Sequence, residues 1–309
     1  MSKKLVKQQI LKVASLIADE LALRMVNSEE SRSIALGALL SNQQQSLNFT
    51  NINDFEFKIF SQYGDDGIIQ YLVKNLTIKN KIFIEFGVED FSESNTRFLM
   101  MNNNWSGFVM DCSSENMNKL KTYPWYWKFD IKHKNSFIDA DNINPLLAET
   151  GLENIGLLHI DLDGNDYHIL KILDFSKLKP AILIVEYNSV FGNDRAISIP
   201  YDKDFIRTKA HYSNLFFGAS LPALNQAAIE KGYVLIGCTL SGNNAYFIRK
   251  DLLNDKIKEK SLKEAFIESK FRESRDKSYN LSYLAGADRL KAIKGLEVFN
   301  VETEQLEKL

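Results

Sequence analysis

The chain has 309 residues, of which 45% are hydrophobic and 25% are charged, and its formal net charge is −2. This composition is that of a globular protein with a substantial core. The balanced charge provides no positive field that would favour nucleic acid as a partner. Two cysteines are too few for a disulfide framework. Polar residues interrupt the N-terminal segment, which argues against a secretory signal, and no apolar run reaches the roughly 18 residues of a membrane span. We therefore expect a cytoplasmic protein without a membrane span.

Residues 1–54 are predicted to form a helical N-terminal extension that ends in a linker. Apolar residues recur at helical spacing over 4–26, and a second helical stretch is expected at about 31–40. The polar segment SNQQQSLNFTNIND follows as the linker. The N-terminal helices are expected either to cap the core or to pair with a second subunit, which would make the protein a homodimer.

Residues 55–250 show the alternation of apolar strands and helical patterns that is typical of βαβ units. The last two strands are joined only by LSGNN, which favours a hairpin. We predict an α/β fold with a Rossmann-like open sheet, mostly parallel with an antiparallel terminal hairpin, and with helices on both faces. The expected strands are 81–87, 106–112, 125–131, 155–163, 181–188, 233–239 and 244–250.

Residues 251–309 are rich in charge and contain opposite charges at three- and four-residue spacing. This spacing is typical of solvated helices. We therefore expect a helical C-terminal extension.

The first candidate site follows the strand predicted at 81–87. In an open α/β sheet, ligands bind beyond the carboxyl ends of the strands. Glu85 ends the strand, Gly87 permits a close backbone approach, and Asn95 belongs to a polar run that can also cap the next helix. The single glycine does not match G-x-G-x-x-G, and the acidic surroundings would repel a pyrophosphate. A cationic sulfonium cofactor suits these carboxylates better.

The second candidate site follows the next strand. Asp111 ends that strand, where a carboxylate can accept both hydroxyls of a ribose, and Cys112 adjoins it. The alternative role of Asp111 is to cap the following helix. Asp130 ends the strand predicted at 125–131 and is a weaker candidate to face an adenine ring.

The third candidate site is a cluster of oxygen ligands. Asp161 and Asp163 end one strand at positions i and i+2, and Glu186 and Asn188 end the next. Residues two apart on a strand share a face, so the four side chains are expected to meet. Three carboxylates this close require a positive charge, which Mg²⁺ would supply. The alternative is that Asp163 and Asn188 serve turns while Asp161 accepts backbone hydrogen bonds.

The segments IEFGVED, DC, IDLDGNDY and VEYN, taken together, resemble class I S-adenosylmethionine-dependent methyltransferases over about residues 60–250. Two branches are similar, the FkbM-like group and the metal-dependent O-methyltransferases. In the second branch an acidic residue after the fourth strand and an acidic–Asn pair after the fifth hold Mg²⁺. The resemblance implies these roles for Asp161, Glu186 and, with one residue inserted, Asn188. It also implies S-adenosylmethionine as cofactor, with Glu85, Gly87, Asn95, Asp111, Cys112, Asp130 and Asp161 as its candidate contacts.

The acceptor and the base are less well marked. His211 lies in a polar insertion after the fifth strand, where substrate loops usually lie, and is the candidate base. Asp161 is the other catalytic candidate. An exposed surface histidine is the alternative. His159, within an apolar strand, is interpreted as a hydrogen-bonded core histidine. The family resemblance suggests a hydroxyl of a sugar or glycan precursor as the acceptor.

The sequence therefore favours an Mg²⁺-assisted O-methyltransferase. Three alternatives remain at this point. They are a metal-independent FkbM-like methyltransferase in which Asp161 and Glu186 orient cofactor and substrate, a catalytically inactive cofactor-binding scaffold, and a metal-dependent hydrolase.

Overall fold

The computed structural model describes residues 3–309. Within the first helix, α1 (Lys3–Gln43), side chains are described from residue 11 onward except at 16, 19, 22, 23, 26 and 27. The core is a seven-stranded sheet with the order β3-β2-β1-β4-β5-β8-β7. Its strands are β1 (Ile82–Phe86), β2 (Ser106–Asp111), β3 (Ile131–Asn135), β4 (Leu157–Ile160), β5 (Ile182–Glu186), β7 (Tyr233–Cys238) and β8 (Asn244–Arg249).

The first five strands run parallel, and β8 and β7 form the antiparallel hairpin that was expected at the end of the sheet. The parallel strands follow the order 3-2-1-4-5 of doubly wound nucleotide-binding folds. The predicted class, an open Rossmann-like sheet with an antiparallel hairpin, is confirmed. Because the order reverses between β1 and β4, the crevice for a ligand is expected at the carboxyl ends of these two strands.

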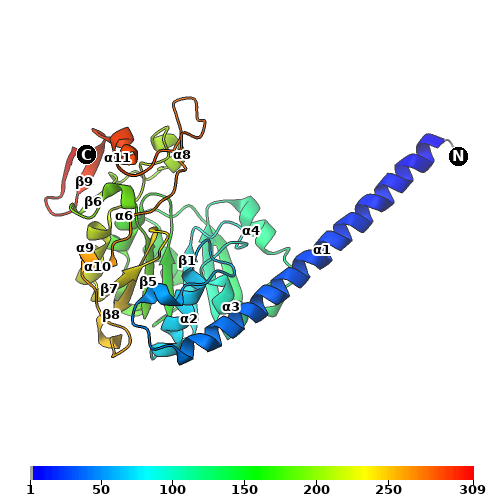
Figure 1. Ribbon diagram of the computed structural model, residues 1–309, viewed down its shortest axis with the longest axis horizontal. Coiled ribbons are helices and arrows are strands. Elements are labelled where there is room, and N and C mark those ends of the chain that lie inside the picture. The colour runs from blue at the N-terminus through cyan, green and yellow to red at the C-terminus, as the bar shows by residue number, and fades with distance from the viewer. Residues whose placement is uncertain (1–2) are drawn as a thin grey trace.

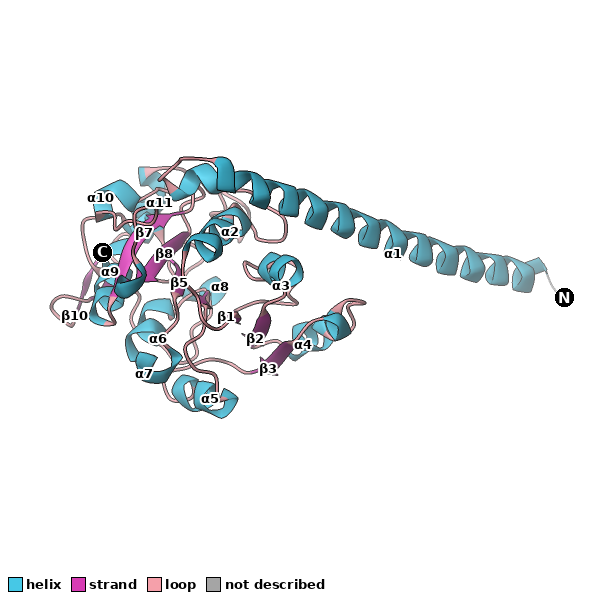
Figure 2. Cartoon of the chain, turned by 90° about the horizontal axis from the view of Figure 1, so that it is seen from below, coloured by secondary structure: helices cyan, strands magenta, loops and turns pink. Residues whose placement is uncertain are grey.

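Helices cover both faces of the sheet (Figure 2). Side chains alternate along each strand, so that in β1 Phe83 packs into one hydrophobic cluster and Ile84 into the other. One face carries α2 (Asp65–Asn75), α3 (Arg97–Asn103) and α4 (Ser114–Leu120). The other carries α5 (Ile143–Thr150), α6 (Asp166–Ile172), α7 (Phe175–Leu178) and α9 (Leu221–Glu230).

The N-terminal extension is one continuous helix rather than the two stretches that were predicted. The end of α1 packs on α2 and α3, and its first half projects from the core (Figure 1). Val13, Ile17 and Leu21 on this half are exposed. Leu5 and Ile10, which belong to the same predicted stripe, lie outside the described side chains. Two 3₁₀ turns, η1 (Gln44–Ser46) and η2 (Ile52–Phe55), form much of the linker.

The third strand lies later in the chain than predicted. Residues 125–131 were expected to form it, but β3 begins at Ile131, and Tyr126–Lys128 form the 3₁₀ turn η3. The ring of Trp125 is buried and stacks with Tyr123 at 5.1 Å between centroids. The aromatic run thus packs as a cluster. The more polar segment that follows can form the strand because β3 lies at an edge of the sheet.

The C-terminal extension is not the solvated helical segment that was predicted. It contains three short helical turns and a hairpin, which pairs with β6 (Ile197–Ser198) in a second, three-stranded sheet. The i,i+4 charge pairs contribute only about 0.3–0.5 kcal/mol each. Burial contributes more: Ala265 packs into the core of the main sheet, and Ile293 and Val298 form a smaller cluster with residues that follow β5. The elements are η5 (Lys250–Leu252), α10 (Leu262–Ala265), α11 (Ala287–Ile293), β9 (Glu297–Asn300) and β10 (Gln305–Lys308). Among the described residues, no helix is both long and apolar enough to cross a membrane.

Candidate functional site

A cavity of about 620 Å³ lies at the carboxyl ends of the parallel strands. Most of the predicted site residues lie on its wall, namely Glu85, Gly87, Asn95, Asp111, Cys112, Asp161, Asp163 and Glu186. They come from β1, β2, β4, β5 and the loops that follow these strands. The sheet therefore brings residues from about 100 positions of sequence to one crevice, as expected for parallel strands.

Glu85 and His159 form a buried ion pair between β1 and β4. His159 Nδ1 lies 2.9 Å from Glu85 Oε1, and both side chains are almost fully buried. Ser94 and Thr96 donate to the other carboxylate oxygen, and the Asn95 amide donates to Oε1 at 3.0 Å. Burial raises the pKa of Glu85, but the hydrogen bond and charge of His159, together with the hydrogen bonds from Ser94 and Thr96, hold it below its usual value. Glu85 is thus an internal support of the cavity floor.

The same pair explains His159. Burial lowers its pKa, but the hydrogen bond and charge of Glu85 raise it above the usual value. The second ring nitrogen lies 3.3 Å from the Asn95 side-chain amide. The interpretation of His159 as a hydrogen-bonded core histidine is confirmed, and the ring also reaches the cavity wall.

Gly87 follows β1 and lies against the backbone that follows β4. Its φ is +72°, and a Cβ atom there would lie 1.7 Å from the carbonyl oxygen of Asp161. No other residue fits this contact without moving the chain that carries Asp161. The glycine predicted from the strand-turn pattern is therefore a steric requirement of the crevice.

Asp111 faces the cavity in a constrained position. Its Oδ2 accepts from the Glu89 amide at 2.9 Å, and its Oδ1 accepts from the Ser113 amide at 2.7 Å. The N-cap of α4 is Ser113, whose side chain accepts from the Asn116 amide, so Asp111 is not the helix cap. Each carboxylate oxygen keeps a second lone pair for a ligand.

The prediction for Asp130 is wrong. Because β3 begins at Ile131, Asp130 precedes the strand, and its carbonyl accepts from the amide of Gly107 near the start of β2. Asp130 therefore lies at the amino edge of the sheet, opposite the cavity. The residues that actually follow β3 on the cavity wall are Ser136, Phe137 and Ile138.

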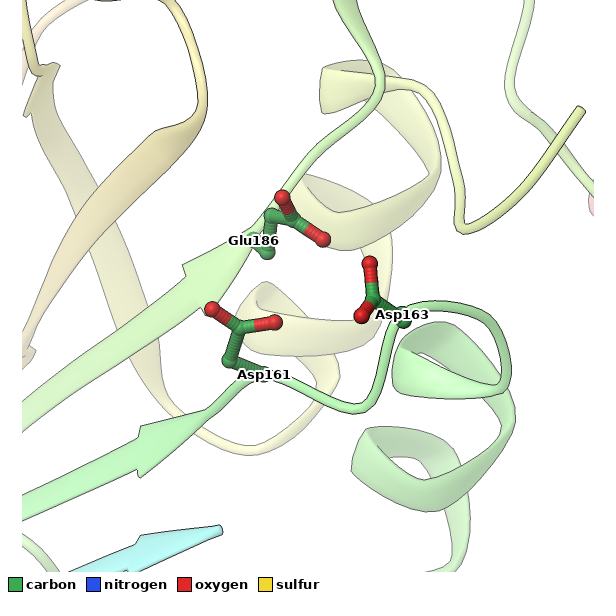
Figure 3. A group of neighbouring side chains, drawn as sticks. All are labelled: Asp161, Asp163 and Glu186. Atoms are coloured by element: carbon green, nitrogen blue, oxygen red, sulfur yellow. The ribbon is translucent and has the colours of Figure 1, made fainter. Parts of the chain in front are cut away.

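Asp161, Asp163 and Glu186 form the predicted acidic cluster (Figure 3). One oxygen from each side chain lies within 4.8 Å of the others. Burial and neighbouring acidic groups raise the pKa of Asp161 to about 8 and the pKa of Glu186 well above its usual value. Glu186 Oε2 is buried and has no hydrogen-bond partner among the described residues. The cluster thus has a deficit of positive charge.

Arg207, on the short helix α8 (Arg207–Ala210), partly meets this deficit. Its guanidinium donates to Asp163 Oδ1 at 2.6 Å, and its carbon lies 3.6 Å from the centroid of the Phe217 ring. Sequence reasoning did not identify Arg207. It placed the insertion after β5 near the substrate, and Phe205, Ile206, Arg207, Thr208 and Asn214 from this insertion do line the cavity.

Asn188 does not join the cluster. Its side-chain amide donates to the carbonyls of Leu215 and Phe217 at 2.9 and 3.0 Å, and its oxygen accepts from the Val190 amide at 3.0 Å. These bonds cap the turn η4 (Ser189–Phe191) and hold the end of the insertion. Of the two interpretations of Asn188, metal ligand or turn residue, the structure therefore favours the turn residue.

His211 is outside the cavity wall. Its Nδ1 lies 2.7 Å from the Ser213 hydroxyl, and its ring packs on Tyr212 with 4.2 Å between centroids. Burial lowers the pKa of His211. A base must be able to reach its proton, so the prediction that His211 is the catalytic base is corrected.

No family model and no curated protein matches this chain. Solved structures with an overall likeness include TrmK of M. capricolum in complex with S-adenosyl-homocysteine, with 15% identity, a TM-score of 0.37, and coverage of 68% of this chain and 78% of that one. The N-terminal domain of EvdMO1 with SAH bound has 10% identity and a TM-score of 0.37, and the match covers 58% and 76% of the two chains.

A third structure is the geranyl diphosphate C-methyltransferase from Streptomyces coelicolor A3(2) with Mg²⁺, geranyl diphosphate and S-adenosyl-L-homocysteine. It has 11% identity and a TM-score of 0.33, and the match covers 54% of this chain and 59% of that one. At such low scores and identities, these likenesses carry no part of the functional argument, which rests on the site.

Proposed function

We propose that this chain is an S-adenosylmethionine-dependent O-methyltransferase, assisted by Mg²⁺ and acting on a hydroxyl of a sugar or glycan precursor. The observation that carries the proposal is the crowding of Asp161, Asp163 and Glu186 at the end of a cavity that opens at the switch point of the sheet. S-adenosylmethionine would supply an electrophilic methyl group, and Mg²⁺ would lower the pKa of a hydroxyl bound to it.

The acidic wall supports a cofactor that carries positive charge and no phosphate. Glu89, Asp111 and Asp161 line the cavity, and a pyrophosphate placed among them would be repelled. Asp111 would accept the ribose hydroxyls with its free lone pairs, and Gly87 lines the cavity beside it. Asn95 and Cys112 lie on the same wall.

The acidic cluster fits Mg²⁺ by its donor set, since hard cations prefer carboxylate oxygens. The unpaired Oε2 of Glu186 and the raised pKa of Asp161 both indicate that a positive charge would stabilise these groups. Asp161, Asp163 and Glu186 would hold the metal. The bound metal would orient the acceptor hydroxyl, because methyl transfer requires an in-line approach to the methyl group.

A metal-independent transferase is the second candidate, and Arg207 is the observation that favours it. The guanidinium already neutralises Asp163, so Asp161 with its raised pKa would act as the proton acceptor. Assays with and without EDTA separate the two mechanisms. Complete loss of transfer in EDTA, with recovery on adding Mg²⁺, is expected for the preferred one.

Calorimetric titration with S-adenosylhomocysteine tests the cofactor. We expect binding by the wild type and a loss of affinity of roughly tenfold to a hundredfold for Asp111→Ala, because a charged hydrogen bond contributes about 1.5–3 kcal/mol. Asp130→Ala is the matched control, since Asp130 lies at the opposite edge of the sheet. No binding by the wild type would exclude the methyltransferase and leave the hydrolase, whereas binding without turnover would favour the inactive scaffold.

Two further expectations remain predictions. They are a cytoplasmic location and a homodimer formed through the exposed apolar residues of α1. Sedimentation of the full chain and of Ile17→Lys would test the second one.

A further inference from the structure

A second cavity of about 270 Å³ adjoins the first. Glu186, Arg207 and Asn243 line both cavities, so the acidic cluster borders the second cavity through Glu186. A metal held by this cluster in the first cavity could reach an acceptor in the second cavity past Glu186. The volume is slightly below the range of ordinary ligand pockets, which suits a molecule about the size of one ring.

The C-terminal extension forms the outer wall of this second cavity. Phe271 of the extension stacks on Tyr63 with 5.0 Å between ring centroids and 22° between planes. The extension is held tightly, because a Cβ atom on Gly242 would lie 2.6 Å from the amide nitrogen of Ser269. The aromatic pair is therefore part of a fixed wall, and aromatic faces of this kind bind flat or ring-shaped ligands.

Cationic groups outnumber anionic ones on the wall of the second cavity. Its arginines are Arg207, Arg272 and Arg289, and its carboxylates are Glu186 and Glu273. Arg207 is engaged by Asp163, and Glu186 is a proposed metal ligand. Arg272 remains exposed, and its Nε donates to the carbonyl of Tyr283 at 3.1 Å.

Arg289 is the most informative of these residues. Its side chain is only 3% exposed. One terminal nitrogen donates to the Ser269 hydroxyl at 2.8 Å, and the other donates to the Ser269 carbonyl and to Glu268. Its Nε has no acceptor among the described residues. A buried donor without an acceptor is costly, and an oxygen of a bound ligand would remove that cost.

We propose that the second cavity binds the methyl acceptor, and that this acceptor is a ring compound carrying a carboxylate. The ring lies beside Phe271, the carboxylate accepts from Arg289 and Arg272, and a hydroxyl points to Glu186. This inference rests on the proposed function and extends it by giving the chemical class of the acceptor. A uronic acid and a hydroxylated benzoate share the required chemistry.

Paired probes test the proposal and distinguish the two sources. Calorimetric titrations of the full chain with Mg²⁺ compare D-glucuronate with D-glucose, and 3,4-dihydroxybenzoate with catechol. We expect the carboxylate of at least one pair to bind roughly tenfold or more tightly than its neutral partner. The pair that shows the difference identifies a sugar or an aromatic ring. Equal binding within both pairs would overturn the proposal.

Variants then locate the effect. Arg272→Gln removes an exposed guanidinium and is expected to lower the affinity for the carboxylate probe at least about threefold, with little change for the neutral one. Arg289→Lys keeps the buried charge but removes Nε, and it is also expected to lower the affinity for the carboxylate probe. Lys270→Gln is the matched control, because Lys270 is an exposed cation of the same segment that does not line the cavity. If Arg272→Gln prefers the carboxylate probe over the neutral probe as strongly as the wild type does, the assignment is overturned.

S-adenosylhomocysteine binding is measured in the same variants and is expected to stay unchanged. This second titration distinguishes a failure of the proposed function from a failure of the proposed acceptor class. If the wild type does not bind S-adenosylhomocysteine but prefers the carboxylate probes through Arg272, the methyltransferase proposal fails. The second cavity is then still a binding site for ring compounds that carry a carboxylate. If it binds S-adenosylhomocysteine but shows no carboxylate preference, only the acceptor class is wrong.

Discussion

Two groups of ionisable side chains lie side by side in the crevice, and they are compensated differently. Glu85 is met by His159 and by donors from the loop of residues 94–96, so its charge is balanced within the fold. Asp161 and Glu186 lie close to other carboxylates, and Glu186 has an oxygen without a partner among the described residues. A balanced buried charge is a structural support, whereas an unbalanced group at a cavity marks a binding site. The contrast yields four predictions.

The largest effect is expected at the balanced pair. Glu85→Gln would leave His159 as a buried cation without its counter-charge, and breaking such a pair costs about 3–5 kcal/mol. We expect the free energy of unfolding, measured by urea denaturation, to fall by that amount. Glu89→Gln is the control, because Glu89 lines the same cavity but is exposed. A stability change below about 1 kcal/mol in Glu85→Gln would mean that the pair is not a support.

The opposite sign is expected at the unbalanced cluster. Asp161→Asn removes a carboxyl whose pKa is raised to about 8 by burial and by its acidic neighbours. The charged form of this carboxyl is disfavoured in the folded protein, so we expect the free energy of unfolding of the metal-free variant to exceed that of the wild type at neutral pH. Mg²⁺ binding and methyl transfer are expected to be lost. Asp204→Asn, an exposed acid, should change neither. A destabilised Asp161→Asn variant would contradict the comparison.

The two groups should also differ in their dependence on pH. The pKa of Asp161 is raised when folded, so its protonated form stabilises the fold below about pH 4, and this contribution is lost as the pH rises toward about 8. The pKa of Glu85 is lowered, so its contribution is present above the usual value and is lost as the pH falls. Denaturation curves at pH 5, 6.5 and 8 should show that the wild type loses stability relative to Asp161→Asn. Saturating Mg²⁺ should remove this loss. A stability difference between the two proteins that does not change with pH would contradict the prediction.

The smallest effect is expected at Arg207, which lies between the two cavities. Arg207→Gln removes the cation that neutralises Asp163, so Mg²⁺ should bind a few-fold more tightly, roughly threefold for a partly solvated charge. Lys209→Gln on the same helix should leave the affinity unchanged, because Lys209 is exposed and does not line the cavity. Weaker Mg²⁺ binding in Arg207→Gln, measured by calorimetry, would argue that the arginine supports the site instead of competing with the metal.

The sequence by itself was sufficient for the order of the core elements and for the ends of four strands. Glu85, Asp111, Asp161 and Glu186 each follow a short apolar run, and parallel strands necessarily bring such ends to one edge of the sheet. Short apolar runs and the polar residues that end them are local signals, so they can be recognised without knowing the fold.

Only the tertiary structure decided which of these acids are neutralised and by what. His159 reaches Glu85 across neighbouring strands, and Arg207 reaches Asp163 over 44 positions of sequence. The position of β3, the turn role of Asn188 and the path of the C-terminal extension likewise depend on which side chains find space against the core. Such contacts join residues far apart in the chain, and no local pattern encodes them, which is why His211 and Asp130 were misplaced.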